Sequence, residues 1–319
     1  MKKVLITGST GYIGTALVRS LSQRSLYRLI LPVRRIDNSA KDSYEQKLIE
    51  DINDVASSIF TKVDVVIHLA GKAHDLSGSK ELNDEFRRVN VEATARLASQ
   101  ALAAGVKRFI YLSSIGVCGS CTQDMAFTED CIPHPSTDYA RSKFDSEEAI
   151  RDIVEGSPME AIFIRPPLVY SASAPGNFSR LLKLVALGLP LPFKNVKNKR
   201  SIVALENLVD FIARCIEQPS RGNDLFLISD DEDVSTEQIV RYLAQGMNRR
   251  VILFPVPRKA ARSLAISLGK GQMYTQLYGS LTIDCTKARE TLTWVPRLAV
   301  KDALRRAGSE YSHTLLSTN

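Results

Sequence analysis

The chain of 319 residues is 44% hydrophobic and 24% charged, which is ordinary for a globular protein of one large or two moderate domains. Its formal net charge of +7 favours polyanionic ligands, but the basic residues look scattered and do not alternate with aromatic residues, so we expect no nucleic-acid binding. No apolar stretch reaches the roughly 18 residues of a membrane-spanning helix, so we expect a cytoplasmic protein without an integral membrane segment.

The first predicted element is a strand over 3–7 that leads into a glycine-rich turn and then a helix. The turn reads TGSTGYIG over 7–14, and Leu17 and Leu21 follow at helical spacing. Glycine permits positive φ and close backbone approach, and the start of a helix offers amides to a phosphate. The pattern predicts a dinucleotide pyrophosphate site. Its predicted residues are Gly8, Thr10, Gly11, Tyr12, Ile13 and Gly14.

The second predicted strand, 29–33, is followed by two arginines. NAD-binding proteins usually place an acid here, where it accepts hydrogen bonds from the ribose 2′-hydroxyl. Arg34 and Arg35 stand there instead, and an arginine can pair with the 2′-phosphate of NADP through two hydrogen bonds. The sequence therefore favours NADP(H), while nearby Asp37 keeps NAD(H) as the alternative.

Further apolar runs alternate with helical stretches along the chain. Strands covered on both faces and separated by helices predict an α/β fold with a doubly wound parallel Rossmann sheet. These strands are expected at 63–69, 109–113, 161–165 and 225–228, and the helices at 85–104, 139–154 and, after a capping box at 235–238, up to 247.

Proline and glycine become frequent after Arg165, and this change predicts a smaller C-terminal α/β substrate lobe. We expect the NAD(P)-binding Rossmann domain to cover 1–168, with 201–232 returning to it. The substrate lobe is expected over 169–200 and 233–319.

Three polar residues form a candidate catalytic group. Tyr139 and Lys143 are one helical turn apart, and an ammonium beside a phenol favours the phenolate, which predicts a lowered pKa for Tyr139. Such a group can exchange a proton with an alcohol oxygen. Ser114 follows the strand over 109–113, where a hydroxyl can donate to a substrate oxygen. Taken singly, the Tyr/Lys pair also fits a solvated helix face, and the serine fits a turn.

The chain has five cysteines, an odd number that fits a reducing compartment better than a disulfide framework. Cys118 and Cys121 form one CxxC pair, but no second pair or histidine cluster accompanies them. We therefore expect no metal site.

The glycine turn, the serine after the fifth strand and the YxxxK helix together resemble the extended short-chain dehydrogenase/reductase family, over nearly the whole chain. The resemblance implies that Tyr139 is the catalytic acid/base, Lys143 its partner and Ser114 a ligand of the substrate oxygen. Tyr139 and Lys143 would also lie beside the cofactor. The other cofactor contacts that it implies are Asp51, Ile52, Leu69, Ala70, Gly71, Asn90 and Pro166.

Within that family the chain is most similar to nucleotide-sugar 4-epimerases and UDP-4-keto-sugar reductases. This implies a UDP-sugar substrate, and the long helix over 85–104 allows a homodimer. In the related 4,6-dehydratases, an acid pair after the hydroxyl residue removes water from the sugar. Ile115 and Gly116 stand at these positions here, so this chain lacks the catalysts of that elimination. The implied substrate contacts are Ser114, Asn177, Leu191, Phe193 and Arg200.

A dedicated NADPH site suits net reduction, because a 4-epimerase consumes no reductant and commonly retains NAD. The sequence thus favours NADPH-dependent reduction at C4 of a UDP-4-keto sugar. Three alternatives stay open: a UDP-sugar 4-epimerase with retained NAD, a reductase of a non-nucleotide ketone, and an NADP-binding redox sensor.

Overall fold

The computed structural model describes residues 1–37, 44–72, 84–219 and 222–317. The chain folds into two compact units. The N-terminal unit consists of 1–118, 132–165 and 209–226, and the C-terminal unit of 119–131, 166–208 and 227–319. No helix among the described residues is long and apolar enough to cross a membrane.

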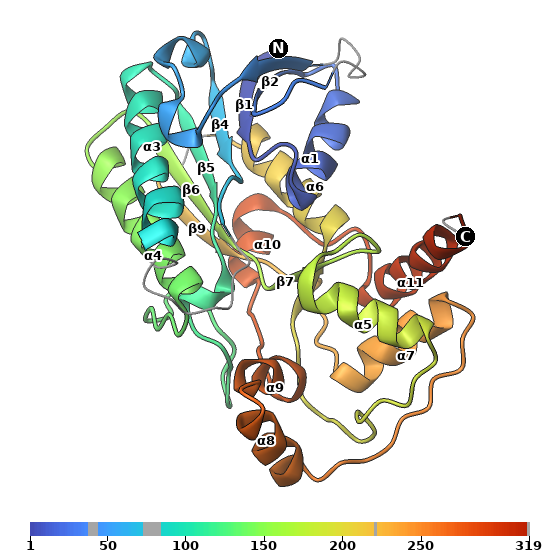
Figure 1. The fold of residues 1–319 in the computed structure, drawn as a ribbon. Coiled ribbons are helices and arrows are strands. Elements are labelled where there is room, and N and C mark those ends of the chain that lie inside the picture. Colours follow the sequence, from blue (N-terminus) through green and yellow to red (C-terminus); the bar gives the residue numbers. More distant parts are fainter. Residues whose placement is uncertain (38–43, 73–83, 220–221, 318–319) are drawn as a thin grey trace. The chain divides into compact units, whose positions relative to one another are not determined.

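The N-terminal unit is built on a seven-stranded sheet in the order β3-β2-β1-β4-β5-β6-β9 (Figure 1). Neighbouring strands from β3 to β6 pair in parallel, which confirms the predicted doubly wound Rossmann fold. The edge strand β3 was not predicted, because its sequence YEQKL is polar. The strands are β1 (Lys2–Thr7), β2 (Tyr27–Val33), β3 (Tyr44–Leu48), β4 (Val65–His68), β5 (Arg108–Leu112), β6 (Glu160–Arg165) and β9 (Asp224–Leu227).

Helices cover both faces of this sheet, with α1 (Tyr12–Ser22) and α6 (Leu205–Glu217) on one side (Figure 1). On the other side lie α3 (Ala93–Ala103) and α4 (Asp138–Val154). Leu5, Val66 and Phe109 are fully buried beneath the second pair, as the apolar strand pattern predicted. Strand order reverses between β1 and β4, so the loops after these strands meet at one edge, where such sheets bind ligands.

The helix expected over 85–104 is interrupted by a π-helical segment, η3 (Arg87–Glu92), directly before α3. Its wider turn includes Asn90, whose side chain is buried. π-Helical turns inside α-helices often mark functional positions. The described part of this unit also contains the 3-10 helices η1 (Ile52–Asp54), η2 (Ser57–Phe60) and η4 (Ile115–Val117).

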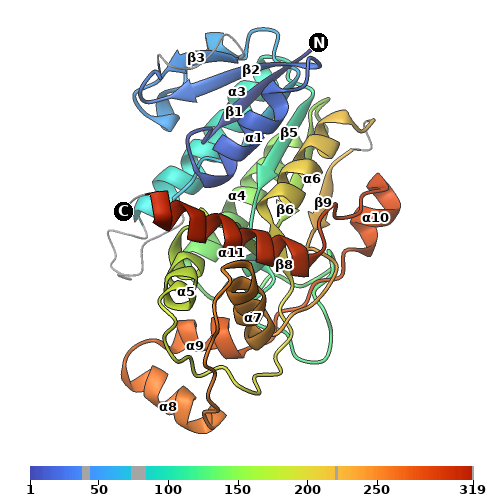
Figure 2. The ribbon, with the colours of Figure 1, turned by 90° about the vertical axis from the view of Figure 1, so that its right-hand side faces the viewer.

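The C-terminal unit has a two-stranded parallel sheet and several helices, with α11 packed on α7 (Figure 2). The predicted capping box is confirmed: Ser235 and Gln238 satisfy each other's backbone amides at the start of α7. The elements are β7 (Leu168–Tyr170), β8 (Ile202–Ala204), α5 (Gly176–Ala186), α7 (Thr236–Gly246), α8 (Arg258–Ser267), α9 (Gly271–Tyr278), α10 (Thr286–Leu292) and α11 (Val300–Ser317).

A buried ion pair joins α4 to the end of β6. The guanidinium of Arg165 donates to both carboxylate oxygens of Glu147, at 2.9 and 2.6 Å, and Ser113 donates to the same carboxylate. Arg151 adds a third donor group at 3.0 Å. A carboxylate satisfied from several sides can remain charged in the interior. This network fixes α4, and with it Tyr139 and Lys143, against the carboxyl edge of the sheet.

We predict that Glu147→Ala lowers the free energy of unfolding by about 3–5 kcal/mol, because it leaves the Arg165 guanidinium buried without its countercharge. Glu148→Ala is the matched control. Glu148 is exposed on the same helix, where its ion pair with Arg151 contributes at most about 1 kcal/mol. Urea unfolding of both variants measures the difference, and equal losses would contradict the assigned role of Glu147.

Candidate active site

The glycine turn leaves no room for side chains where it meets the neighbouring loop. Gly8 has a φ of 70°, and a methyl group built on it would lie 2.6 Å from the amide nitrogen of Ala70. A methyl group on Gly14 would lie 2.1 Å from the carbonyl oxygen of Gly8. The side chains of Leu69 and Ala70 lie half-buried beside this contact. Three backbone segments therefore approach each other as only glycine allows.

The turn also fits a phosphate group chemically. Helix α1 begins at Tyr12, and first-turn amides such as those of Ile13 and Gly14 have no acceptor within the helix. Among the described residues, the Ser9 hydroxyl is buried and has no hydrogen-bond partner. A buried hydroxyl of this kind is costly unless a ligand completes it. Ser9 was not among the residues predicted from the sequence, although it stands inside the glycine motif. Thr10, which was predicted, is exposed at the same turn.

Polar groups gather where β4 and β5 end. Asn90 accepts from the Lys72 amide at 2.8 Å and donates to the Ser142 hydroxyl at 2.9 Å. A methyl group on Gly71 would lie 3.1 Å from the Asn90 side-chain oxygen and 3.5 Å from Lys143 Nζ. The structure thus brings together Gly71, Asn90 and Lys143, three of the residues that the family resemblance implied.

His68 lies behind this group in a fully buried position. Its ring nitrogens contact the hydroxyls of Thr7 at 2.6 Å and Thr94 at 2.8 Å. Burial, helped by the charge of Lys143, lowers the pKa of His68 to about 3, so the ring is neutral. His68 therefore ties β4 to β1 and α3, and it is not placed to exchange protons at neutral pH.

The expected effect of Lys143 on Tyr139 is absent from the free protein. Burial raises the pKa of Tyr139 to about 12, so the predicted lowering is wrong. The ammonium of Lys143 instead donates to the Leu112 carbonyl at 2.9 Å and lies 4.6 Å from the centre of the Tyr111 ring. The ammonium of Lys143 therefore lies at the end of β5, where both of these partners are uncharged.

The two serines after β5 have different roles. Ser113 is buried and donates to Glu147, whereas Ser114 is half-buried at the start of η4 and accepts from the Gly116 amide at 3.1 Å. A methyl group on Gly116 would lie 3.2 Å from Ala140 Cβ and 3.3 Å from Ser114 Oγ. Glycine there lets Ser114 approach the turn of α4 that carries Tyr139, and Ile115 is buried. Neither position carries the acid pair of the 4,6-dehydratases.

The oxidation state of the cysteines differs from the expectation. Cys118 and Cys131 are disulfide-bonded, while Cys121, Cys215 and Cys285 are free thiols. The CxxC spacing is therefore not the oxidised pair, and Cys121 is exposed. Among the described residues, no group of three or more histidine, cysteine, aspartate or glutamate side chains could hold a metal ion.

The remaining cofactor candidates lie at the margins of the site. Arg34 and Arg35 are exposed after β2. Asp51 caps η1 and accepts from the Asn53 amide at 2.9 Å, and this bond, first among its contacts, lowers the pKa of its carboxyl. Ile52 is half-buried, and Pro166 is buried directly after β6. Because both arginines are exposed at a strand end, this region is compatible with NAD(H) as well as with NADP(H).

The candidate substrate residues lie in the C-terminal unit, apart from Ser114. Asn177 is exposed on α5 and donates to Gln276 at 2.6 Å. Leu191 and Phe193 are buried, and Leu191 pairs its backbone with Ile252 and Phe254 at 2.9 and 3.1 Å. Their side chains therefore belong to the core of this unit, so a ligand there would meet mainly the backbone.

Arg200 is the candidate with the most informative surroundings. Its side chain is 9% exposed, and its one hydrogen bond, to the Gly279 carbonyl, is long at 3.5 Å. Burial lowers the pKa of the guanidinium. Among the residues that the structure describes, no carboxylate forms an ion pair with Arg200. A buried cation with only a neutral, distant acceptor is a natural binder of an anionic ligand.

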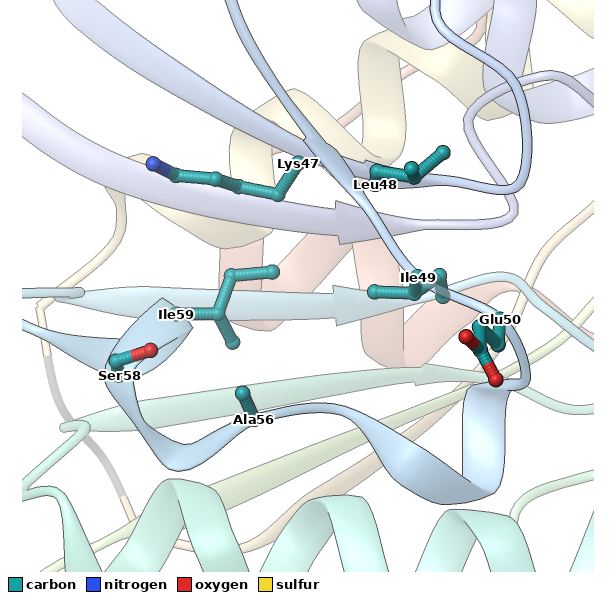
Figure 3. Close-up of a pocket in the computed structure, with 7 residues that line it drawn as sticks. All are labelled: Lys47, Leu48, Ile49, Glu50, Ala56, Ser58 and Ile59. Carbon is teal, nitrogen blue, oxygen red and sulfur yellow. The ribbon is translucent and has the colours of Figure 1, made fainter.

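A pocket beside β3 is lined by none of these candidate residues, although it ends next to Asp51 (Figure 3). It contains neither the glycine turn nor any catalytic candidate, so we assign it no part in the site. Its lining residues are Lys47, Leu48, Ile49, Glu50, Ala56, Ser58 and Ile59.

Comparison with known proteins identifies the family of this chain. Residues 4–228 match the NAD dependent epimerase/dehydratase family. The chain belongs to that family. It is 36% identical over 318 residues to a UDP-glucose 4-epimerase of Vibrio cholerae, which covers 97% of this chain and 95% of that protein.

Two solved structures of epimerases share the fold. The UDP-glucuronic acid 4-epimerase of Bacillus cereus, in complex with NAD, is 20% identical with a TM-score of 0.80, covering 98% of this chain and 99% of that one. The UDP-glucose 4-epimerase of Thermotoga maritima, with UDP-glucose, is 19% identical with a TM-score of 0.76 and the same coverage. The 36% identity to a UDP-glucose 4-epimerase favours the epimerase alternative over the expected 4-keto reduction, and these comparisons give no support to the expected NADP preference.

The contact between Gly14 and Gly8 generates a prediction about cofactor binding. We expect Gly14→Ala to weaken NAD binding at least about a hundredfold, because the added methyl group must displace the turn at which we predict the pyrophosphate to bind. Gly271→Ala is the control, since nothing lies within 4 Å of a methyl group there. Isothermal titration calorimetry with NAD measures both, and unchanged affinity in Gly14→Ala would contradict the assignment.

The buried ammonium of Lys143 predicts a dependence of stability on pH. Burial lowers its pKa from 10.5 to about 8, so between these values the unfolded chain binds more protons and stability rises with pH. The free energy of unfolding of the wild type, minus that of Lys143→Met, should increase by about 3 kcal/mol between pH 7 and pH 10.5. Urea titrations at each pH test this, and a difference independent of pH would refute it.

Proposed function

We propose that this protein is a UDP-sugar 4-epimerase that retains NAD. The observation that carries the proposal is the identity of 36% to a UDP-glucose 4-epimerase across nearly both chains. A 4-epimerisation inverts one carbon and leaves the substrate's atoms unchanged, so it requires no external reductant. The arrangement of Ser114, Tyr139 and Lys143 supports the same chemistry, because inversion needs one proton to leave and return at a single oxygen.

Each of these residues has a defined part in the proposed reaction. Tyr139 takes the proton from the C4 hydroxyl and later returns it, while Ser114 donates to the same oxygen and orients it. Lys143 holds the cofactor ribose and supplies the positive charge that offsets the phenolate. Bound NAD would supply the chemistry that oxidises C4 and reduces it again from the opposite face. Because burial raises the pKa of Tyr139, we expect the phenol to exchange its proton only once cofactor and substrate lie beside it.

The nucleotide part of the substrate is assigned to the C-terminal unit. Arg200 would form an ion pair with the diphosphate, because no carboxylate among the described residues pairs with its guanidinium. The backbone of 191–193 would contact the uracil, and Asn177 would add a polar contact from the start of α5. The glycine turn and Ser9 would hold the cofactor pyrophosphate in the N-terminal unit.

One observation favours a second function. The exposed Arg34 and Arg35 stand where a 2′-phosphate would lie, as in an NADPH-dependent 4-keto-sugar reductase. The epimerase takes precedence because a guanidinium at this place tolerates NAD as well as NADP.

The deciding experiment is mass spectrometry and NMR of UDP-glucose and UDP-N-acetylglucosamine incubated with the purified enzyme without added cofactor. We expect formation of the C4 epimer to an equilibrium mixture, and a loss of at least about 10³-fold in rate for Tyr139→Phe. Conversion of a UDP-4-keto sugar only when NADPH is present, with no epimer in its absence, would establish the reductase instead.

Arg200 provides a separate test of the substrate class. We predict that Arg200→Ala raises KM for the UDP-sugar about 30- to 100-fold, since loss of a charge-assisted contact removes roughly 2–3 kcal/mol of binding. The value of kcat should change much less. Arg297→Ala in the same unit serves as the control, and UDP affinity unchanged by Arg200→Ala would exclude a diphosphate ligand at this position.

A further inference from the structure

The positive charge of this chain is concentrated in one segment of the C-terminal unit, contrary to the scattered pattern expected from its overall composition. Residues 238–283 contain seven basic residues and no aspartate or glutamate. The formal charge of this segment therefore equals the +7 of the whole chain, and the rest of the chain is balanced. The seven residues are Arg241, Arg249, Arg250, Arg258, Lys259, Arg262 and Lys270.

Helix α8, in the middle of this segment, has no buried residue. In both views it lies at the margin of the C-terminal unit beside α9 (Figures 1 and 2). It is held there by the Lys270 amide, which donates to the Ala265 carbonyl at 2.7 Å, and by the Tyr274 hydroxyl, which donates to the Arg258 carbonyl at 3.3 Å. Only its two inner alanines, at 261 and 265, are half-buried. The helix is thus anchored at a few points and otherwise faces solvent.

Large aliphatic side chains are exposed on this helix among the basic ones. Leu264 is 62% exposed, Ile266 59% and Leu268 61%. The preceding strand-like segment adds Ile252, at 60%, and Phe254, at 42%. Single exposed aliphatic residues are common on protein surfaces, but several within one short segment mark an interaction site.

We propose that α8 and its flanking residues dock on an anionic phospholipid bilayer. Basic groups attract the negatively charged headgroups, and aliphatic groups on the same short helix enter the boundary between headgroups and acyl chains. Charge complementarity selects this partner from the alternatives. A nucleic acid would match the charge but leave Leu264 and Leu268 exposed, and α8 itself has no aromatic side chain on which bases could stack, Phe254 being the exposed aromatic residue of the flanking segment.

The docking surface is tied by hydrogen bonds to the segment assigned to the nucleotide. The Leu191 amide donates to Ile252 at 2.9 Å, and the Phe254 amide donates back to Leu191 at 3.1 Å. The Tyr278 hydroxyl, at the end of α9, donates to the Pro192 carbonyl at 2.7 Å. Membrane docking would therefore bring 191–193 to the bilayer surface. The docking itself does not depend on which sugar is bound or on the reaction catalysed.

The test is co-sedimentation of the full-length protein with vesicles of phosphatidylcholine, alone or mixed with phosphatidylglycerol. We expect binding to the mixed vesicles at least about tenfold tighter than to neutral ones, weakening as salt is added. Two variants separate the contributions. Arg258→Glu/Lys259→Glu/Arg262→Glu should abolish binding, and Leu264→Ser/Leu268→Ser should reduce it at least about fivefold at unchanged charge.

The charge-matched control is Lys62→Glu/Lys107→Glu/Lys301→Glu, which alters exposed lysines outside 238–283 and should retain binding. Thermal unfolding of each variant checks that it is folded, and this readout is independent of epimerase activity. The proposal is overturned if wild-type protein binds both kinds of vesicle equally or neither. It is also overturned if the control loses as much binding as the α8 variant, or if the leucine variant binds as wild type, which would leave a general polyanion site.

Discussion

The contact on which the N-terminal unit depends is the approach of three backbone segments at Gly8, Gly14 and Ala70. No side chain fits between them, so the loop after β1, the start of α1 and the loop after β4 are fixed relative to one another. This places helix amides and the orphaned Ser9 hydroxyl at the edge of the sheet where the strand order reverses. The position of the proposed cofactor site follows from these steric limits.

The buried cationic side chains differ in whether a carboxylate forms an ion pair with them. Arg165 is buried with Glu147 and serves the architecture by fixing α4. Lys143 and Arg200 are buried, and the side-chain hydrogen bonds that the structure describes for them go to backbone carbonyls, although the charge of Glu147 also acts on Lys143. Burying a cation in this way costs stability, and a bound anion or developing negative charge recovers it. Lys143 and Arg200, which form no ion pair among the described contacts, are therefore the cations that we expect to bind ligands.

Much of the N-terminal unit was predictable from the sequence, because most of its strands are apolar on both faces and three of its glycines are grouped in the turn after β1. Polar β3 was missed since its pattern resembles a loop, and the π-helical turn at Asn90 has no signal in residue periodicity. The raised pKa of Tyr139 was also missed, because spacing shows that Lys143 is near but not that its ammonium points to Leu112. The basic segment 238–283 was hidden by an average over the whole chain.

The cofactor preference shows the limit of reasoning from single residues. Arg34 and Arg35 predicted NADP(H), yet both are exposed and a cation there excludes neither cofactor. The most direct measurement of the proposed reaction uses UDP-glucose labelled with deuterium at C4, with the enzyme as purified. The account predicts that the C4 epimer forms with the deuterium still at C4, because the same hydrogen leaves and returns. Loss of the deuterium, or no epimer unless NADPH is supplied, would contradict it.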